Sequence, residues 1–125
     1  MILDTNAVSA WAEGHPGVQS PLRSADRLVV LVIVLGEYYF GIRQSRYRRR
    51  YENWLRRYLP LVEIATITQV TAEVYAQLRL ELKRAGNPIP PNDAWIAALA
   101  RQHTLPVLSN DAHFDRVEGI TRIAF

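Results

Sequence analysis

Apolar runs of strand length alternate along the chain with stretches whose apolar residues recur every three or four positions. Leu28–Val32 is wholly apolar, as expected of a strand that is buried on both faces. Further strands are predicted at Met1–Leu3, Leu61–Ala65, Leu105–Leu108 and Gly119–Phe125. Strands that alternate with helices in this way indicate an α/β fold around a central, mainly parallel sheet of four to five strands.

The helical stretches are bounded by residues that begin or end helices. They are Thr5–Trp11, a helix from about Val34 to Gly41, Ser45–Leu59, a long helix from Thr68 or Thr71 to Gly86, and Asp93–His103. The segment Gly14–Gly17 breaks the first of them and Pro60 ends the third. Asn92 is the expected N-cap of the last. Because no linker or repeat interrupts this order, residues 1–125 are predicted to form one domain.

The composition is that of a globular protein, with 49% hydrophobic and 22% charged residues among 125. The absence of cysteine excludes disulfides and thiolate metal sites and agrees with the cytosol. No basic or secretory segment precedes the first strand, and the longest apolar run, Leu28–Leu35, has only eight residues. A membrane span needs roughly 20. We therefore expect a soluble, cytoplasmic protein without a membrane partner.

Four acidic residues stand at one predicted edge of the sheet. Asp4 follows the first strand, Asp111 follows the strand that ends at Leu108, and Asp93 opens a helix. Glu37 lies in the first turn of the helix after the second strand. Each acid alone has a simple structural explanation as a cap or turn residue. Because parallel sheets bind ligands beyond the carboxyl ends of their strands, the four are together predicted to converge.

Converged carboxylates repel one another, so such a cluster needs a compensating cation. With no cysteine and few histidines, the expected ion is a hard, oxygen-liganded one, Mg²⁺ or Mn²⁺. One or two such ions can turn water into a nucleophile and offset charge at a phosphoryl centre. The predicted chemistry is the hydrolysis of phosphodiester bonds.

The net charge is +3, and arginine supplies 14 of the 15 basic residues. Half of these arginines fall between residues 43 and 57, among the aromatic residues Tyr47, Tyr51, Trp54 and Tyr58. The aromatic side chains are expected to face the core. The arginines, above all Arg48, Arg49 and Arg50, are predicted to contact RNA, because an acidic cleft needs positive charge nearby to attract a polyanion.

The remaining candidates are weaker. His15, His103 and His113 lack the spacing of metal ligands, and RNA contact by His113, two residues from Asp111, is not expected. Trp95 is assigned to the core or to a dimer interface rather than to base stacking.

Four segments also occur in an order and at spacings typical of one family: Ile2–Asn6, Leu35–Gly41, Ile89–Ala98 and Leu108–Phe114. With them the chain resembles the PIN-domain nucleases, in particular the VapC-type toxins of bacterial toxin–antitoxin pairs, along nearly its whole length. The resemblance implies a three-layer αβα sandwich and an endoribonuclease that depends on Mg²⁺ or Mn²⁺.

The resemblance also assigns roles to residues and partners. Asp4, Glu37, Asp93 and Asp111 occupy the acidic positions of the family, and Asn6 and Ser109 stand where supporting polar residues often lie. It implies a homodimer, silenced by a VapB-like antitoxin that the arginines could also contact, and a tRNA or a ribosomal RNA loop as the substrate. Two features depart from the family pattern: the wholly apolar stretch Leu31–Val34 lacks a serine or threonine cap, and His113 replaces a common acid.

Other functions are weaker or remain open. A haloacid dehalogenase-type phosphohydrolase needs a second aspartate two residues after Asp4, where Asn6 stands. A solitary PIN-domain nuclease without an antitoxin, and an inactive domain that only binds RNA or antitoxin, remain as alternatives, although none of the four acids is missing.

Overall fold

The computed structural model describes residues 1–125 and contains one parallel sheet. Its strands are β1 Ile2–Leu3, β2 Val29–Leu31, β3 Glu63–Ala65, β4 Val107–Leu108 and β5 Arg122–Ile123. They lie in the order β3-β2-β1-β4-β5, so the first strand of the chain is the central one. Ile2 is paired with Val29 on one side and with Val107 on the other. The predicted parallel sheet is confirmed, with shorter strands than the apolar runs suggested.

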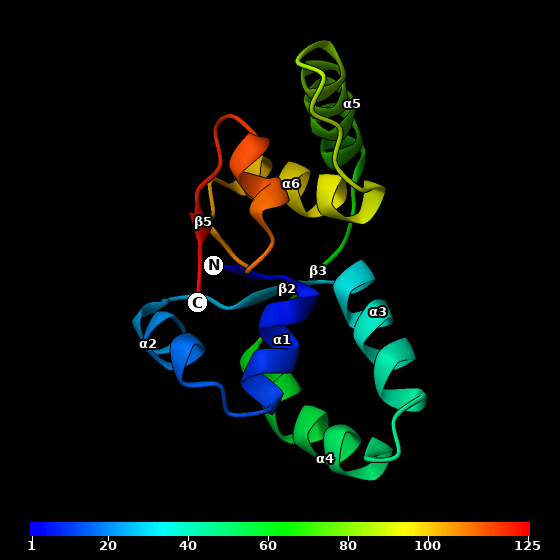
Figure 1. Cartoon of the computed structure of the whole chain (residues 1–125), viewed down its shortest axis with the longest axis vertical. Helices are drawn as coiled ribbons and strands as arrows, with labels where there is room; N and C mark the ends of the chain where they lie inside the picture. Colours follow the sequence, from blue (N-terminus) through cyan, green and yellow to red (C-terminus); the bar gives the residue numbers. More distant parts are fainter.

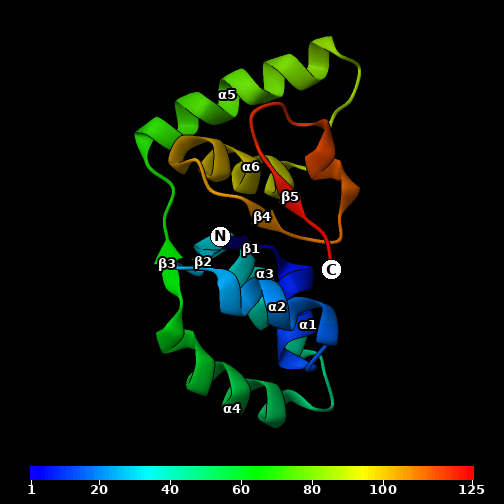
Figure 2. The same ribbon diagram turned by 90° about the vertical axis from the view of Figure 1, so that its left-hand side faces the viewer.

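Two layers of helices enclose this sheet. The helices are α1 Thr5–Ala12, α2 Pro16–Ser24, α3 Val32–Arg43, α4 Arg48–Tyr58, α5 Gln69–Arg84 and α6 Pro91–His103, with short 3-10 turns η1 Leu59–Leu61 and η2 Ala112–Arg116. Helices α1 to α4 lie on one side of the strands and α5 and α6 on the other (Figures 1 and 2). The predicted three-layer αβα sandwich is therefore confirmed. None of these helices is both long and apolar enough to cross a lipid bilayer.

Helix α3 begins earlier and ends later than predicted. Strand β2 stops at Leu31 and the helix starts at Val32, without a side-chain cap, so the apolar run is split between two elements. The helix also continues past Gly41 to Arg43. The third predicted helix is shorter than expected, because α4 begins only at Arg48. Pro60 lies inside η1, where its missing N–H removes no helical hydrogen bond.

Helix α2 was not predicted. Its sequence holds Pro16, Gly17 and Pro21, which weaken helical propensity, but proline is well placed at a first helical position. The ring nitrogen Nδ1 of His15 accepts a hydrogen bond from the backbone N–H of Gly17 and caps the helix. Val18 is completely buried. Tertiary packing thus overrides a weak local preference.

Helices α5 and α6 pack closely on each other. Thr68 caps α5, and the hydroxyl of Thr71 accepts a hydrogen bond from the backbone N–H of Thr68, so both predicted candidates take part. Gly86 ends the helix region at φ +70°, a left-handed conformation that glycine adopts without strain. The rings of Tyr75 and Trp95 stack with their centroids 3.8 Å apart. Trp95 is therefore half-buried and packed against α5 at the edge of the core.

Candidate active site

Asp4 lies at the end of the central strand and is almost completely buried, with 5% of its surface exposed. Its Oδ1 accepts a hydrogen bond of 2.7 Å from the backbone N–H of Thr5. Its Oδ2 accepts bonds of 2.7 Å from the Ser109 hydroxyl and 3.0 Å from the Asn6 amide. Burial raises the pKa of the Asp4 carboxyl, and the bonds from Ser109 and Thr5 oppose that rise.

Ser109 links the segment after β4 to residues near the N-terminus by hydrogen bonds. Its hydroxyl oxygen accepts hydrogen bonds from the backbone N–H of Asp111, at 2.9 Å, and from the Asn6 amide, at 3.1 Å. The Asn6 side-chain oxygen in turn accepts the backbone N–H of Asn110. The loop after β4 is therefore fixed against Asp4 and the first turn of α1, which places Asp111 on the same edge of the sheet as Asp4. Both predicted polar neighbours, Asn6 and Ser109, contact Asp4 directly.

Glu37 projects from α3 and is held by two residues that the sequence did not single out for it. The Thr5 hydroxyl donates a hydrogen bond of 2.6 Å to Oε2, and the Asn92 amide donates one to Oε1. The prediction that Asn92 caps α6 is wrong, because the helix begins at Pro91 and its N-cap residue is Pro90. Pro91 suits the first helical position because it has no N–H to satisfy. Asn92 is the second residue of the helix, and its side chain bonds to Glu37 instead of capping the helix.

Asp93 and Asp111 approach each other around His113. The ring nitrogen Nδ1 of His113 lies 3.1 Å from Asp93 Oδ2 and 2.9 Å from Asp111 Oδ1. One atom from each of the three side chains fits within 4.8 Å, a spacing that could hold a metal ion. Burial raises the pKa of the Asp93 carboxyl, and the nearby charges of Asp4 and Asp111 add to it, whereas the bond to His113 opposes it. This position of His113 was not foreseen from its spacing in the sequence.

The four acids thus come from four separate segments and meet at the carboxyl edge of the sheet. The charge of Glu37 and that of Asp111 both act on Asp4. None of the four acids is within 4.0 Å of an arginine or lysine nitrogen. The arginines that form ion pairs do so with Glu52, Glu63, Glu81 and Asp115. The available ligand atoms are carboxylate oxygens and one imidazole nitrogen, a set that fits a divalent cation.

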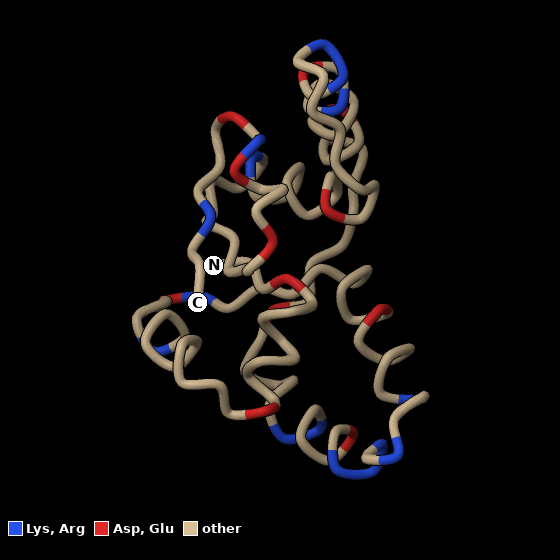
Figure 3. The backbone as a smooth tube through the Cα atoms, viewed as in Figure 1, with Lys and Arg blue, Asp and Glu red and all other residues tan.

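The arginines of α4 lie at one end of the molecule (Figure 3). Arg48 is paired with Glu52 one helical turn away, at 2.6 Å. Arg49 and Arg50 are exposed and have no acidic partner within 4.0 Å. A polar groove of about 180 Å³ reaches from Thr5 and Glu37 to Tyr51, near the start of α4. The groove thus joins the acidic site to α4 at Tyr51, and the arginines of α4 are not among its lining residues.

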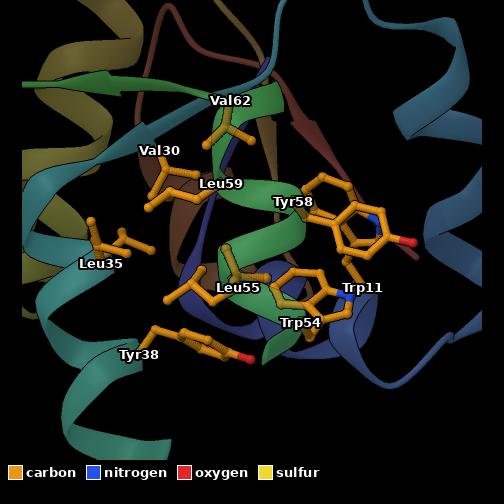
Figure 4. Close-up of a pocket in the computed structure, with 11 residues that line it drawn as sticks. Trp11, Val30, Leu35, Tyr38, Trp54, Leu55, Tyr58, Leu59 and Val62 are labelled. Atoms are coloured by element: carbon orange, nitrogen blue, oxygen red, sulfur yellow. The ribbon is translucent and has the colours of Figure 1, made fainter. Parts of the chain in front are cut away.

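Most of the aromatic side chains of α4 serve packing, as expected. Trp54 and Tyr58 lie against Trp11, with ring centroids 5.2 and 5.3 Å from it. Tyr47, which stands just before α4, is different, since it is 48% exposed. Figure 4 shows how Trp54, Leu55 and Tyr58 close an apolar gap beneath α4. Its volume of about 20 Å³ would hold roughly one water, and its lining is entirely hydrophobic, so it is a packing gap and not a ligand site.

Known proteins are similar to this chain along nearly its whole length. The sequence profile of the PIN domain matches residues 1–120. Ribonuclease VapC2 of Haemophilus influenzae is 30% identical over 93% of this chain and 90% of its own length. Ribonuclease VapC5 of Mycobacterium tuberculosis is 26% identical over 98% of this chain and 90% of its own length.

Among solved structures, a DNA-bound VapBC complex from Salmonella typhimurium superposes with a TM-score of 0.86 and 25% identity. The match covers 98% of this chain and 96% of the other. The sequence profile, the relatives and the shared fold agree along almost the whole chain, and this protein therefore belongs to the PIN-domain family.

Proposed function

We propose that this protein is an endoribonuclease dependent on Mg²⁺ or Mn²⁺, and the toxin of a toxin–antitoxin pair. Its catalytic and metal-binding residues would be Asp4, Glu37, Asp93 and Asp111. The observation that supports this most directly is their convergence at one edge of the sheet without an arginine or lysine partner. Carboxylates gathered in this way need a cation, and their oxygens suit these two ions.

The residues around the acids have distinct tasks in this proposal. A bound ion supplies an activated water and offsets negative charge at the phosphorus. Ser109 and Asn6 orient Asp4 through the hydrogen bonds that they donate to its Oδ2. Thr5 and Asn92 together fix both oxygens of Glu37. Because all of these donors sit on or beside helices and strands, the acids are held in place before any substrate binds.

Arg49 and Arg50 are proposed to contact the phosphates of the RNA, or acidic groups of the antitoxin, with Arg48 beside them. Both residues are exposed on α4, the helix whose Tyr51 lines the groove that also contains Glu37. An acidic site repels a polyanion unless positive charge lies near the path of the strand, and arginine suits phosphate recognition. The relatives named as ribonucleases make RNA, such as a tRNA or an exposed ribosomal RNA loop in the cytoplasm, the substrate to test first.

Cleavage by the purified protein tests the enzymatic proposal. Structured RNA should be cut with Mg²⁺ or Mn²⁺ and left intact with EDTA. Asp4→Asn and Asp93→Asn should each lose about a thousandfold or more of the rate, since each removes a ligand charge from the phosphoryl chemistry. Glu73→Gln is the matched control, because Glu73 is an exposed acid on α5. Cleavage in EDTA, or full activity of both aspartate variants with intact circular dichroism spectra, would refute the mechanism.

The toxin role draws on the VapBC complex that shares this fold. We infer a VapB-like antitoxin as the partner of this chain and a homodimer as its own state. Expression of the chain alone should arrest growth, and expression together with a small protein encoded next to it should restore growth and yield a stable complex. Growth arrest that no neighbouring gene relieves would indicate a solitary nuclease instead. Normal growth with active RNA cleavage in vitro would also contradict the toxin role.

A further inference from the structure

His113 is the one side chain at the acidic edge whose position is not explained by the proposed roles of the four acids. It lies on η2, directly before Phe114, which is buried to 1% exposure and anchors the turn. The Asp111 carboxylate accepts the backbone N–H of His113 at 2.9 Å and caps the same turn. The backbone at position 113 is thereby fixed beside Asp111, and the ring is carried into the site.

The ring is placed as a ligand would be. Nδ1 is within 3.1 Å of a carboxylate oxygen of Asp93 and 2.9 Å of one of Asp111, and the three atoms lie within 4.8 Å of one another. The side chain of His113 is 34% exposed and that of Asp111 33%, so an ion can reach them from solvent.

We propose that Nδ1 of His113 is a ligand of the divalent ion, together with Asp93 and Asp111, and that this nitrogen makes the site select Mn²⁺ over Mg²⁺. The inference rests on the proposed function, because it requires that the acidic edge binds a divalent ion. In the bound form the ring is neutral, the lone pair of Nδ1 faces the ion, and the ring hydrogen is on Nε2. No other histidine is near enough to serve, since the candidate ligand cluster contains only His113.

The selectivity follows from ligand chemistry. Mg²⁺ strongly prefers oxygen ligands and keeps much of its water shell, whereas imidazole is a good ligand for first-row transition ions. A site with carboxylates alone would discriminate little between Mg²⁺ and Mn²⁺. One imidazole nitrogen among the carboxylates shifts the preference to Mn²⁺ while keeping the site suited to a hard ion.

The direct test is electron spin-echo spectroscopy of the full chain, stripped of metal and then loaded with one equivalent of Mn²⁺. The spectrum of the wild type should show nitrogen modulation from a coordinated imidazole. His113→Ala and His113→Asp should both lack it, while the matched control His103→Ala should retain it. His103 is a suitable control because it is exposed and stands at the opposite end of α6 from Asp93.

Calorimetric titrations give a second readout that does not depend on catalysis. The wild type should bind Mn²⁺ at least about tenfold more tightly than Mg²⁺, and His113→Asp should reduce this ratio severalfold by replacing nitrogen with oxygen. Mn²⁺ bound without nitrogen modulation in the wild type, with RNA cleavage intact, would overturn the role of His113 and leave the proposed function standing. Failure of the wild type to bind Mn²⁺ or Mg²⁺ at all would overturn both.

Discussion

The hydrogen-bond network around Ser109 leads to a quantitative prediction for stability. Ser109→Ala removes the bond to the buried Asp4 carboxylate, and bonds of this charged kind contribute about 1.5–3 kcal/mol. It also leaves the backbone N–H of Asp111 without its acceptor, which costs about 1–3 kcal/mol if no water replaces it. Because Asn6 still donates to Asp4, we expect a total loss of about 2–4 kcal/mol in the free energy of unfolding.

Urea titration followed by circular dichroism, in EDTA and at one fixed protein concentration, measures this loss. For a chain of this length it corresponds to a melting temperature lower by about 10 °C. Ser20→Ala is the matched control, since Ser20 is exposed on α2 and should change stability by no more than about 0.5 kcal/mol. If the two variants are equally stable, the network does not hold the site together and the reasoning is refuted.

Three further outcomes are expected. Tyr38→Phe should leave stability unchanged or raise it by about 1 kcal/mol in urea titration, because the buried Tyr38 hydroxyl has no hydrogen-bond partner; a large loss would mean that a partner exists. Thr5→Val should lower kcat/KM for RNA by about tenfold or more by releasing Glu37, and Thr5→Ser should restore it; unchanged activity would contradict this positioning role. Burial raises the pKa of Asp93, so its carboxyl binds a proton more tightly in the folded state than in the unfolded state. The protonated carboxyl therefore favours folding at low pH, and this contribution to the free energy of unfolding is lost as the pH rises above 3.8. In EDTA, Asp93→Asn should therefore gain stability relative to the wild type between pH 4 and 7, and equal pH profiles would contradict the assigned shift.

The features that could be predicted from the sequence are those that depend on local pattern and on topology. Apolar runs separated by helical periods indicate a parallel sheet, and such a sheet gathers the residues after its strands at one edge. Asp4 and Asp111 could therefore be brought together although they are far apart in the chain. The boundary at Val32 could not be found, because its apolar run is split between a strand and a helix, with no polar cap to mark the change.

Side-chain partners were harder to predict because they depend on tertiary contacts. Asn92 beside a helix start has the local signature of a cap, and only the position of α3 shows that its amide reaches Glu37. His113 has no second histidine at ligand spacing, and its two carboxylate neighbours come from different elements. Helix α2 was missed for a related reason, since its two prolines mask a helix that the packing of Val18 stabilises.

The distance along the chain between Asp4 and Ser109 has a consequence for the synthesis of this protein. Ser109 comes 105 positions after Asp4, so the whole segment up to Ser109 must be made before the bond that orients Asp4 can form. The central strand β1 is made long before its neighbour β4, with which it pairs in the finished sheet. Contacts of such long range form slowly and late in folding. The acidic edge therefore cannot assemble on a nascent chain until the segment that carries β4 and Ser109 has been made and has left the ribosome.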